Sequence, residues 1–310
     1  MQEPKVIVIA GPTASGKTAL SIALAKKING EIISADSMQI YKYMNIGTAK
    51  PTKEEMAGIK HYLLDFVSPD KRYSVAEFKK DAEKAIEEIL KKGKTPIVVG
   101  GTGLYIDSLI YGIEYPDIKF DEDYRKFLEE KASSEEGLKS LYEKAKEIDE
   151  KAILKISNND KKRIMRILEI YHATGKTKTE LEIESRKNGV KYDYKVFVIN
   201  MDREKLYDRI NKRVDIMIEN GLIDEVKDIL KKFDKFPTAM QGLGYKEVVD
   251  YLYGKYTKDE MIEKLKMETR RYAKRQLTWF RKDKSFIWID GLNDIQNNIK
   301  IILEGWIWKK

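Results

Sequence analysis

The chain has 310 residues, and its hydrophobic fraction of 42% is enough for a buried core in one large domain or two smaller ones. It contains no cysteine and only two histidines, which are far apart in the sequence, so a disulfide framework and a zinc site are both excluded. Lysine and arginine total 59 against 51 acidic residues, and the net charge of +8 suits a polyanionic partner but also simple solubility. No apolar run reaches 18 residues, so we expect a soluble, cytoplasmic protein with no membrane segment.

A phosphate-loop motif follows the first apolar run of the chain, residues 6–10, which we expect to form a strand. The pattern G-x-x-x-x-G-K-[ST] is matched at every fixed position by Gly11, Pro12, Thr13, Ala14, Ser15, Gly16, Lys17 and Thr18. Its glycines permit a turn in which several backbone N–H groups converge on a di- or triphosphate, and Lys17 adds a cation. A helix is expected over residues 19–27, and the positive end of its dipole favours the same anion. The motif therefore predicts a phosphate-binding site.

A second apolar run predicts a strand over residues 31–36 that ends at Asp36. Residues 38–51 have no clean period and are expected to form a loop or a broken helix, followed by a short strand over residues 61–65. In a doubly wound parallel sheet, functional groups gather outside the carboxyl ends of the strands, where the phosphate loop also lies. Asp36 is therefore predicted to lie near the bound phosphates.

Ser74 and Glu77 form a capping-box pattern at the start of an amphipathic helix that ends at Gly93. A continuous apolar strand over residues 95–99 stops at the sequence Gly-Gly-Thr-Gly, and another helix begins after it. Thr102, within that sequence, is thereby placed at the same edge of the sheet as the phosphate loop. The strand does not end in the aspartate that helps to bind magnesium in a typical ATPase, which argues against hydrolysis-driven motor chemistry.

The composition changes at residue 117, and residues 117–192 are rich in lysine and glutamate and have no strand-like run. Three or four amphipathic helices are expected there, with buried faces supplied by Leu128, Leu138, Leu141, Ile153, Ile164, Ile167, Leu168 and Ile170. A β-branched strand returns at residues 195–200, and Arg213 lies on the helix that follows it. We therefore predict an α/β fold with a parallel-sheet core of the P-loop NTPase type, formed by residues 1–116 and 193–310. Residues 117–192 would be an inserted all-helical domain.

The rest of the chain is expected to be mostly helical. Within it, residues 269–284 combine Arg270, Arg271, Lys274, Arg275, Arg281, Lys282 and Lys284 with the aromatic residues Tyr272, Trp279 and Phe280. One interpretation is a helix face that is simply exposed to water. The other is contact with a nucleic-acid backbone, because cations interleaved with stacking surfaces are typical of RNA binding.

Seven segments of the chain, taken in order, resemble the tRNA dimethylallyltransferase (tRNA isopentenyltransferase) family. They are GPTASGKT, ISADSMQIYKYMNIGTAKP, HYLLDFVSP, VVGGTGLY, NDKKRIMRILEIY, GYKE and AKRQLTWFR. The phosphate loop alone would indicate only a superfamily, whereas the second and fourth segments in this order are specific. The resemblance implies transfer of a dimethylallyl group from dimethylallyl diphosphate to N6 of the adenine at position 37 of tRNA, with Mg²⁺ accompanying the diphosphate. It also implies a compact bacterial-type member without the zinc-finger extension of eukaryotic members, and we expect a monomer.

The resemblance assigns roles to five residues. Asp36 would orient the adenine amine and accept its proton, because an exocyclic amine is a poor nucleophile. Lys17, the amides of the phosphate loop and Arg213 would stabilise the charge that grows on the pyrophosphate leaving group, and Thr18 would contact Mg²⁺. Thr102 would form a hydrogen bond near the leaving oxygen or the target nucleotide. The structural alternatives are a helix cap for Asp36, a surface arginine for Arg213 and a turn residue for Thr102.

For tRNA binding, the resemblance points to three short stretches and two single residues. They are Asp36, Ser37, Met38 and Gln39; Lys162, Arg163, Ile164, Met165 and Arg166; Gln241, Gly242, Leu243, Gly244, Tyr245 and Lys246; and Thr102 and Arg125. To these we add Arg271 and Arg275 of the basic helix. The arginines would contact phosphates or stack on bases, or would be only solvated helix charges. The target base must leave its stack to reach Asp36. The resemblance also implies that the inserted helical domain, residues 117–192, contacts the tRNA.

Two other functions are open to this sequence. A small-molecule kinase of the nucleotide-kinase type would share the phosphate loop and a helical insertion, but the second segment and the missing aspartate argue against it. A non-catalytic RNA-binding nucleotide sensor would bind tRNA and would keep every activity when Asp36 is replaced.

Overall fold

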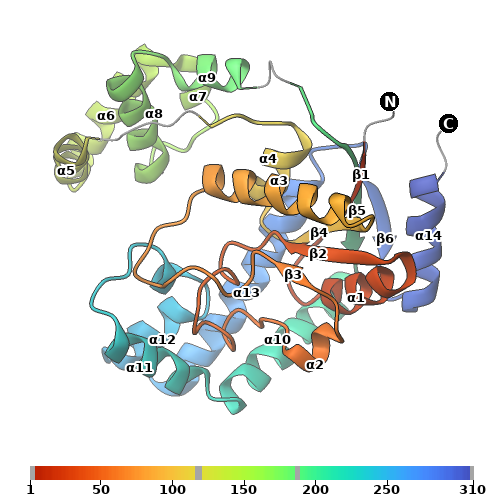
Figure 1. Ribbon diagram of the computed structural model, residues 1–310. Helices are drawn as coiled ribbons and strands as arrows, with labels where there is room; N and C mark the ends of the chain where they lie inside the picture. The colour runs from red at the N-terminus through yellow and green to blue at the C-terminus, as the bar shows by residue number, and fades with distance from the viewer. Residues whose placement is uncertain (1–3, 116–120, 186–188, 308–310) are drawn as a thin grey trace. The chain divides into compact units, whose positions relative to one another are not determined.

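The computed structural model describes residues 4–115, 121–185 and 189–307, and these form two compact units. The first unit consists of the chain up to Ile110 together with the chain from Lys191 onward, and the second of the chain from Tyr111 to Val190 (Figure 1). The predicted boundary at 116/117 lies outside the described residues. The predicted boundary at 192/193 lies just after the division between the units.

The first unit is built on a six-stranded sheet in which every strand pair is parallel, as predicted. The strand order is β3-β2-β4-β1-β5-β6. The strands are β1 (Lys5–Ala10), β2 (Gly30–Ser34), β3 (His61–Tyr62), β4 (Thr95–Gly100), β5 (Asp193–Asn200) and β6 (Ile287–Asp290). The chain moves from β1 to β2 on one side and later to β5 on the other, which makes the carboxyl end of β1 the switch point where ligands bind in such sheets.

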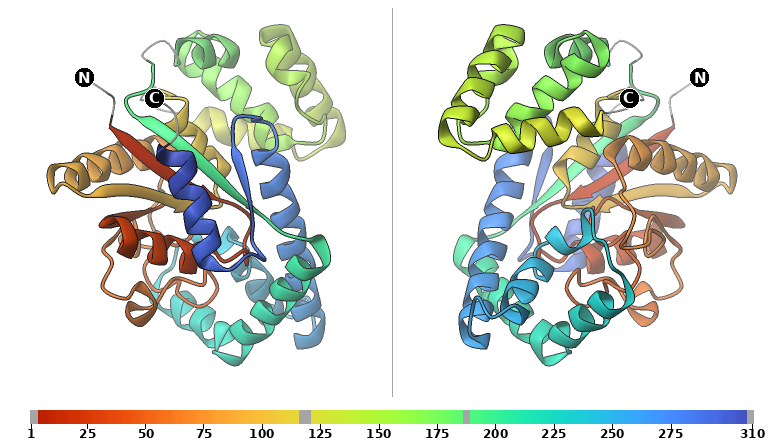
Figure 2. Two further views of the ribbon diagram at one scale, coloured as in Figure 1. Left: turned by 90° about the vertical axis from the view of Figure 1, so that its right-hand side faces the viewer. Right: turned by 90° about the vertical axis from the view of Figure 1, so that its left-hand side faces the viewer.

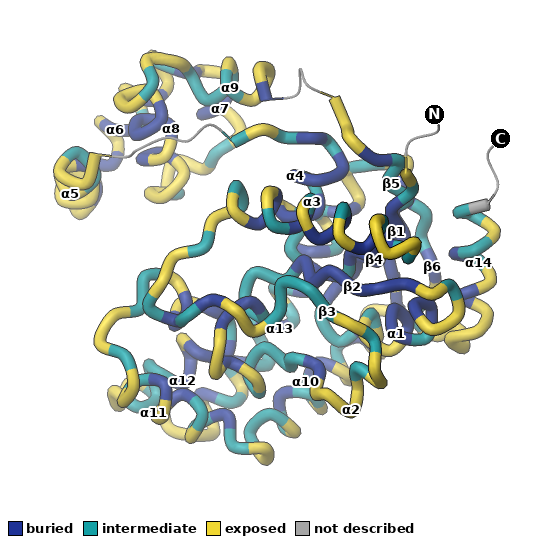
Figure 3. Tube along the Cα trace, in the orientation of Figure 1, coloured by how far each residue is buried: buried dark blue, intermediate teal, exposed yellow. Residues whose placement is uncertain are grey.

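The central strands are continuous apolar runs because both of their faces are covered. In β1, Ile7 and Ile9 pack with α1 (Lys17–Ile28) and α14 (Ile295–Ile307), which lie side by side against one face (Figure 2). Successive strand residues point to opposite faces, so Val6 and Val8 turn to the other side, and all four side chains are fully buried. Burial is concentrated along these strands (Figure 3).

The other helices of the first unit complete its layers. They are α2 (Lys53–Met56), α3 (Val75–Lys91), α4 (Gly103–Ile110), α10 (Arg203–Glu219), α11 (Leu222–Lys232), α12 (Tyr245–Leu252) and α13 (Lys258–Phe280). Helix α3 contacts β2 and β4, and α4 packs against α3 and α13. The predicted capping box of α3 is confirmed, because Ser74 Oγ accepts from the Glu77 N–H while the Glu77 carboxylate accepts from the Ser74 N–H.

The second unit is all-helical and has its own core. Its helices are α5 (Glu122–Lys131), α6 (Glu135–Ile148), α7 (Glu150–Ile153), α8 (Lys161–Thr174) and α9 (Lys178–Glu184). All eight apolar residues predicted to face this core are buried. The described part of the unit thus has five helices rather than three or four. The two shortest, α7 and α9, begin at the capping residues Asp149 and Thr177 and are too short to carry a long apolar stripe.

Three expectations about elements of the first unit need correction. Strand β6 was not predicted, because Ile287 and Trp288 are only half buried at the edge of the sheet and follow a dense run of charges. Strand β3 has two residues rather than five, because Leu63 and Asp65 adopt left-handed φ angles of 57° that stop the pairing. The basic helix begins at Lys258, well before Thr269, and ends at Phe280.

Candidate active site

The phosphate loop connects β1 to α1, and three of its residues have positive φ angles. Gly11, Ala14 and Gly16 have φ angles of 146°, 62° and 92°, and α1 begins at the next residue. A Cβ on Gly11 would lie 3.0 Å from the carbonyl oxygen of Ile199, so the close packing of the loop on β5 requires glycine there. Ser15 is 2% exposed, and its hydroxyl has no hydrogen-bond partner among the described residues. Such a backbone, with an unpaired buried hydroxyl, suits an anion of several oxygens.

Lys17 carries the positive charge of this loop and lies near a second cation, Arg213. Its Nζ donates to the carbonyl of Pro12 at 2.6 Å. Burial and the neighbouring Arg213 guanidinium lower the pKa of Lys17 to about 7, while the negative charge of Asp36 opposes the shift. Burial likewise lowers the pKa of Arg213, against the same pull from Asp36. The structure therefore brings Lys17, Arg213 and Asp36 together, with two cations close enough to repel each other.

Asp36 and Thr102 meet at the carboxyl ends of β2 and β4. One oxygen of Asp36, Oδ1, accepts from the N–H groups of Met38 at 2.8 Å and Gln39 at 3.2 Å. The Thr102 hydroxyl oxygen accepts from the Ser37 N–H at 3.1 Å. A Cβ on Gly100 would lie 2.1 Å from the carbonyl oxygen of Ala35, so glycine is what lets the two strand ends approach this closely. Asp36 does cap a turn, but only its Oδ1 is used for this.

Helix α13 contributes two inward residues, Tyr272, which the sequence suggested only as a stacking surface, and Gln276, which it did not single out. Gln276 contacts both the phosphate loop and the loop after β4. Burial raises the pKa of the Tyr272 hydroxyl, the charge of Asp36 raises it further, and hydrogen bonding to Thr102 offsets part of the shift. The helical spacing of Tyr272, Gln276 and Trp279, at i, i+4 and i+7, was the signal that could have found this face.

The structure changes one part of the expectation of a mixed basic and aromatic surface on α13. Phe280 is fully buried, so its ring is not a stacking surface. Trp279 and Tyr272 do lie beside cations, because the Lys282 Nζ is 4.5 Å from the centre of the Trp279 ring and the Arg275 guanidinium carbon is 5.7 Å from that of Tyr272. The Trp279 Nε1 donates to Asp107 at 3.0 Å. Arg271 and Arg275 do lie on the exposed side of the helix, and Arg271 pairs with Glu268 at 2.7 Å. A phosphate contact by Arg271 and Arg275 stays a prediction.

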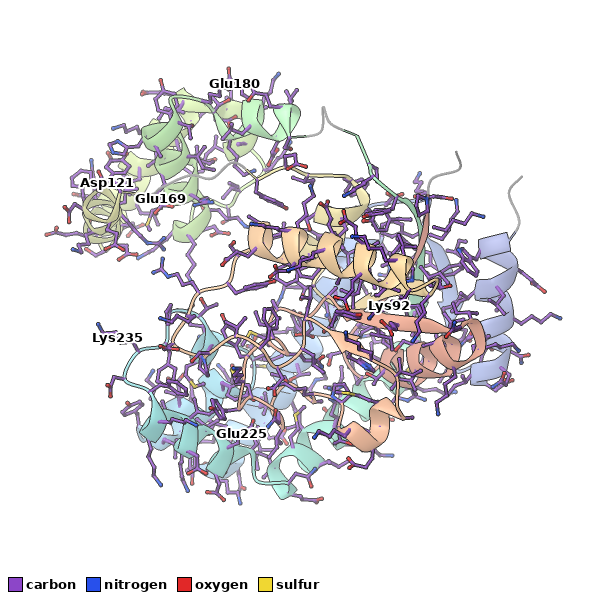
Figure 4. The ribbon with its side chains drawn as sticks, viewed as in Figure 1. Lys92, Asp121, Glu169, Glu180, Glu225 and Lys235 are labelled. Atoms are coloured by element: carbon purple, nitrogen blue, oxygen red, sulfur yellow. The ribbon has the colours of Figure 1, made fainter. Side chains whose placement is uncertain are left out.

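The tRNA-contact candidates of the second unit divide into surface and core residues. Arg125 of α5 and Arg166 of α8 are 41% and 47% exposed, and their NH1 atoms lie 3.5 and 3.8 Å from the carboxylate of Glu169, which is buried and labelled in Figure 4. Lys162 and Arg163 are also exposed. Ile164 and Met165, in contrast, lie in the hydrophobic core of this unit. Their side chains are therefore not surface groups, and the exposed contact atoms of this stretch belong to the cations.

The stretch 241–246 serves partly as packing. Tyr245 is fully buried in a core formed with α11, α12 and α13, while Gln241 and Lys246 are exposed and Leu243 is half buried. A Cβ on Gly242 would lie 2.3 Å from the Met38 methyl, which places this loop against the segment that follows Asp36. Gly244 has a φ angle of 93° and its N–H donates to Glu247, so it shapes the start of α12.

One carboxylate that the sequence did not indicate holds the long loop after Asp36 in place. Glu225 of α11, labelled in Figure 4, accepts from the N–H groups of Asn45, Ile46 and Gly47 at 2.8–3.1 Å. Its Oε1 also accepts from the Tyr245 hydroxyl at 2.6 Å. Four donors thus converge on one side chain, and this fixes the loop 38–51 against α11.

Replacing Glu225 with glutamine should therefore destabilise the first unit. Glutamine offers one acceptor oxygen in place of two, so partly buried donors lose their partner, and we expect a loss of about 1–3 kcal/mol in the free energy of unfolding. Urea unfolding of E225Q and of D228N, an exposed acid-to-amide change on the same helix, provides the measurement and its control. Equal stability of the two variants would contradict this role.

Two further features bear on ligands. Within residues 4–115, 121–185 and 189–307 no cluster of three or more histidine, aspartate and glutamate side chains could hold a metal ion by itself. Thr18, in the first turn of α1, is exposed.

No helix within residues 4–115, 121–185 and 189–307 is long and apolar enough to cross a membrane.

The chain is similar to known proteins of one family. The family model described as IPP transferase matches residues 39–283. The tRNA dimethylallyltransferase of Acetivibrio thermocellus is 57% identical over 96% of this chain and 95% of that protein, and the one from Thermoanaerobacter pseudethanolicus is 51% identical over 89% of each.

Solved structures agree as well. The tRNA isopentenylpyrophosphate transferase of Bacillus halodurans is 43% identical, covers 98% of this chain and 97% of its own, and superposes with a TM-score of 0.73. A eukaryotic dimethylallyltransferase acting on tRNA is 34% identical, with 97% of this chain and 79% of its own covered and a TM-score of 0.81. The P-loop-like core that we predicted is thus shared with these proteins, and the chain belongs to the IPP transferase family.

Proposed function

We propose that this protein transfers a dimethylallyl group from dimethylallyl diphosphate to N6 of the adenine at position 37 of tRNA and releases pyrophosphate. The observation that supports it most is the meeting of two unlike half-sites at one sheet edge. One is an anion cradle with Lys17 and Arg213, and the other is a carboxylate, Asp36, beside the hydroxyl of Thr102. Family membership favours this reaction over that of a small-molecule kinase. We also propose that the protein acts as a monomer in the cytoplasm.

One half-site would act on the attacking amine and the other on the leaving diphosphate. The amine nitrogen forms a bond to C1 of the allylic chain, the C–O bond to the diphosphate breaks, and the nitrogen loses one proton. Asp36 would accept that proton through Oδ2, because Oδ1 already caps the turn at Met38 and Gln39. Lys17, Arg213 and the loop amides would stabilise the negative charge that develops on the leaving oxygen.

The residues present fit a diphosphate that brings its own metal ion. With no cluster of metal-ligating side chains among the described residues, Mg²⁺ would be held by the diphosphate oxygens, water and the exposed hydroxyl of Thr18. When bound, it would neutralise part of the charge on the leaving group. The unpaired buried hydroxyl of Ser15 is a further group that a phosphate oxygen could satisfy.

The test of this function is transfer of label. The purified protein is incubated with tRNA that lacks the modification, Mg²⁺ and ¹⁴C-labelled dimethylallyl diphosphate. We expect label in the tRNA, located by nucleoside mass spectrometry on N6 of adenosine 37, and none in the same tRNA with guanosine at that position. ATP turnover that depends on a small acceptor, with unlabelled tRNA, would instead establish a kinase.

The lowered pKa of Lys17 makes diphosphate binding dependent on pH. In the free protein Lys17 loses its proton as the pH rises through about 7, whereas a bound anion favours the charged form. Binding of inorganic pyrophosphate above pH 7 should therefore take up a proton and should weaken with rising pH, by at most about tenfold per pH unit. Calorimetry in buffers of different ionisation enthalpy measures the number of protons taken up on binding. The K17M variant shows how much of this uptake comes from the titration of pyrophosphate itself. Equal proton uptake by both proteins would contradict the prediction.

A further inference from the structure

Gln276 connects the two half-sites of the proposed reaction directly. Its Oε1 accepts from the N–H of Thr13 in the phosphate loop at 2.9 Å, and its Nε2 donates to the carbonyl of Gly101 at 2.9 Å. The residue is 6% exposed, so both bonds lie in a setting where an unpaired group would be costly. One bond needs an acceptor and the other a donor, and a carboxamide supplies both from a single side chain.

The surroundings leave this amide little freedom. A Cβ on Gly101 would lie 2.1 Å from the Gln276 Nε2 and 3.2 Å from the carbonyl oxygen of Gly11. A second contact from α13 holds the same loop, because a Cβ on Gly103 would lie 2.3 Å from the Trp279 ring. The loop after β4 is therefore fitted to α13 on one side and to the phosphate loop on the other.

From Gly101 the contacts continue to the acceptor half-site. The next residue, Thr102, donates its N–H to the Ala35 carbonyl at 3.3 Å and accepts from the Ser37 N–H at 3.1 Å. Ala35 and Ser37 are the chain neighbours of Asp36. Hydrogen bonds therefore join the phosphate loop to the segment around Asp36. They run from Thr13 through Gln276 to Gly101, and from the next residue, Thr102, to Ser37.

We propose that Gln276 is a positioning residue that sets the separation between the phosphate loop and the edge formed by Asp36 and Thr102. The inference rests on the proposed function, in which the amine and the allylic carbon must meet in line while the diphosphate is held by the loop. Rate in such displacements depends steeply on the distance and angle of the reacting atoms, and a misplacement of about 1 Å is worth roughly 10²-fold. Gln276 touches neither reacting atom and acts through the two loops.

The experiment compares Q276L and Q276E with T278V, an exposed change on the same helix. We expect Q276L to lower the single-turnover transfer rate by about 10²-fold, while the dissociation constant of inorganic pyrophosphate changes far less. T278V should retain the rate of the unmodified protein. Transfer by Q276L within threefold of that rate, or a loss of pyrophosphate affinity as large as the loss of rate, would overturn the proposal.

Q276E provides the test that does not depend on how well Q276L folds. A protonated glutamate can both accept from Thr13 and donate to Gly101, whereas the carboxylate cannot donate. The transfer rate of Q276E, divided by that of the unmodified protein at each pH, should therefore rise as the pH falls from 8 to 6. A constant ratio would overturn the proposal.

The role of Gln276 and the proposed function can fail separately. If the unmodified protein transfers no label, it is the proposed function that fails. If it does and the variants behave like T278V, only the role of Gln276 fails.

Discussion

Replacing Asp36 with asparagine is expected to lower the rate of dimethylallyl transfer by about 10²–10⁴-fold while tRNA affinity stays within a few-fold. Asparagine keeps an oxygen that can accept from the N–H groups of Met38 and Gln39, so the turn that presents the site survives. What it loses is the second carboxylate oxygen that would take the proton from the amine. Single-turnover transfer and filter binding of tRNA measure the two quantities separately.

Two comparisons make this prediction specific. D36A removes the cap as well as the base, so it should also disturb the 37–39 turn and weaken tRNA binding, unlike D36N. D208N changes an exposed aspartate on α10 to the same amide and should keep the full transfer rate. A D36N protein with full turnover would refute the assignment of Asp36 as the base.

Replacing Arg213 with glutamine should also cause a large loss, about 10²–10³-fold in transfer rate. Arg213 lies half-buried and close to Lys17 and Asp36, so its charge acts on the leaving group with less screening by water than that of a surface cation. K212Q, which alters an exposed cation at the neighbouring position of the same helix, is the matched control. Steady-state kinetics of both variants, with dimethylallyl diphosphate and tRNA varied in turn, provide the measurement.

The same variant carries a second readout that does not depend on catalysis. Arg213 is one of the causes that lower the pKa of Lys17. Without Arg213, Lys17 should stay charged to higher pH. The proton uptake that accompanies pyrophosphate binding should therefore begin at a higher pH than in the unmodified protein. Unchanged transfer by R213Q, or an unchanged pH range of proton uptake, would show that Arg213 is a surface charge of the helix and no part of the site.

Local patterns in the sequence predicted much of this molecule. The phosphate loop is fixed by a dense local motif, and the capping box at Ser74 and Glu77 depends on residues three positions apart. The apolar stripes of the helical unit are likewise short-range signals, and the residues in them are buried as expected. The sheet edge that gathers Asp36 and Thr102 follows from the rule for parallel sheets, given correct strand ends.

Long-range contacts explain what the sequence did not show. Glu225 is separated by about 180 residues from the loop N–H groups that it accepts from, and Gln276 by 263 residues from Thr13. Nothing near Glu225 in the chain marks it as special. Gln276 lies in the segment AKRQLTWFR, but that segment does not show which of its residues faces the phosphate loop. Phe280 was misinterpreted for a related reason: its proximity in sequence to seven cations did not show that its ring lies on the buried face of α13.

The central claim is that the phosphate loop holds a leaving pyrophosphate while Asp36 meets the adenine amine at the same sheet edge. A crystal structure of the protein with Mg²⁺, a non-hydrolysable thiolo analogue of dimethylallyl diphosphate and an anticodon stem-loop tests this most directly. It should show the diphosphate against the backbone N–H groups of residues 14–18 and the extruded adenine with its N6 within hydrogen-bond distance of Asp36. An adenine that stays in its stack, or that binds away from Asp36 while the diphosphate lies outside the loop, would contradict the account.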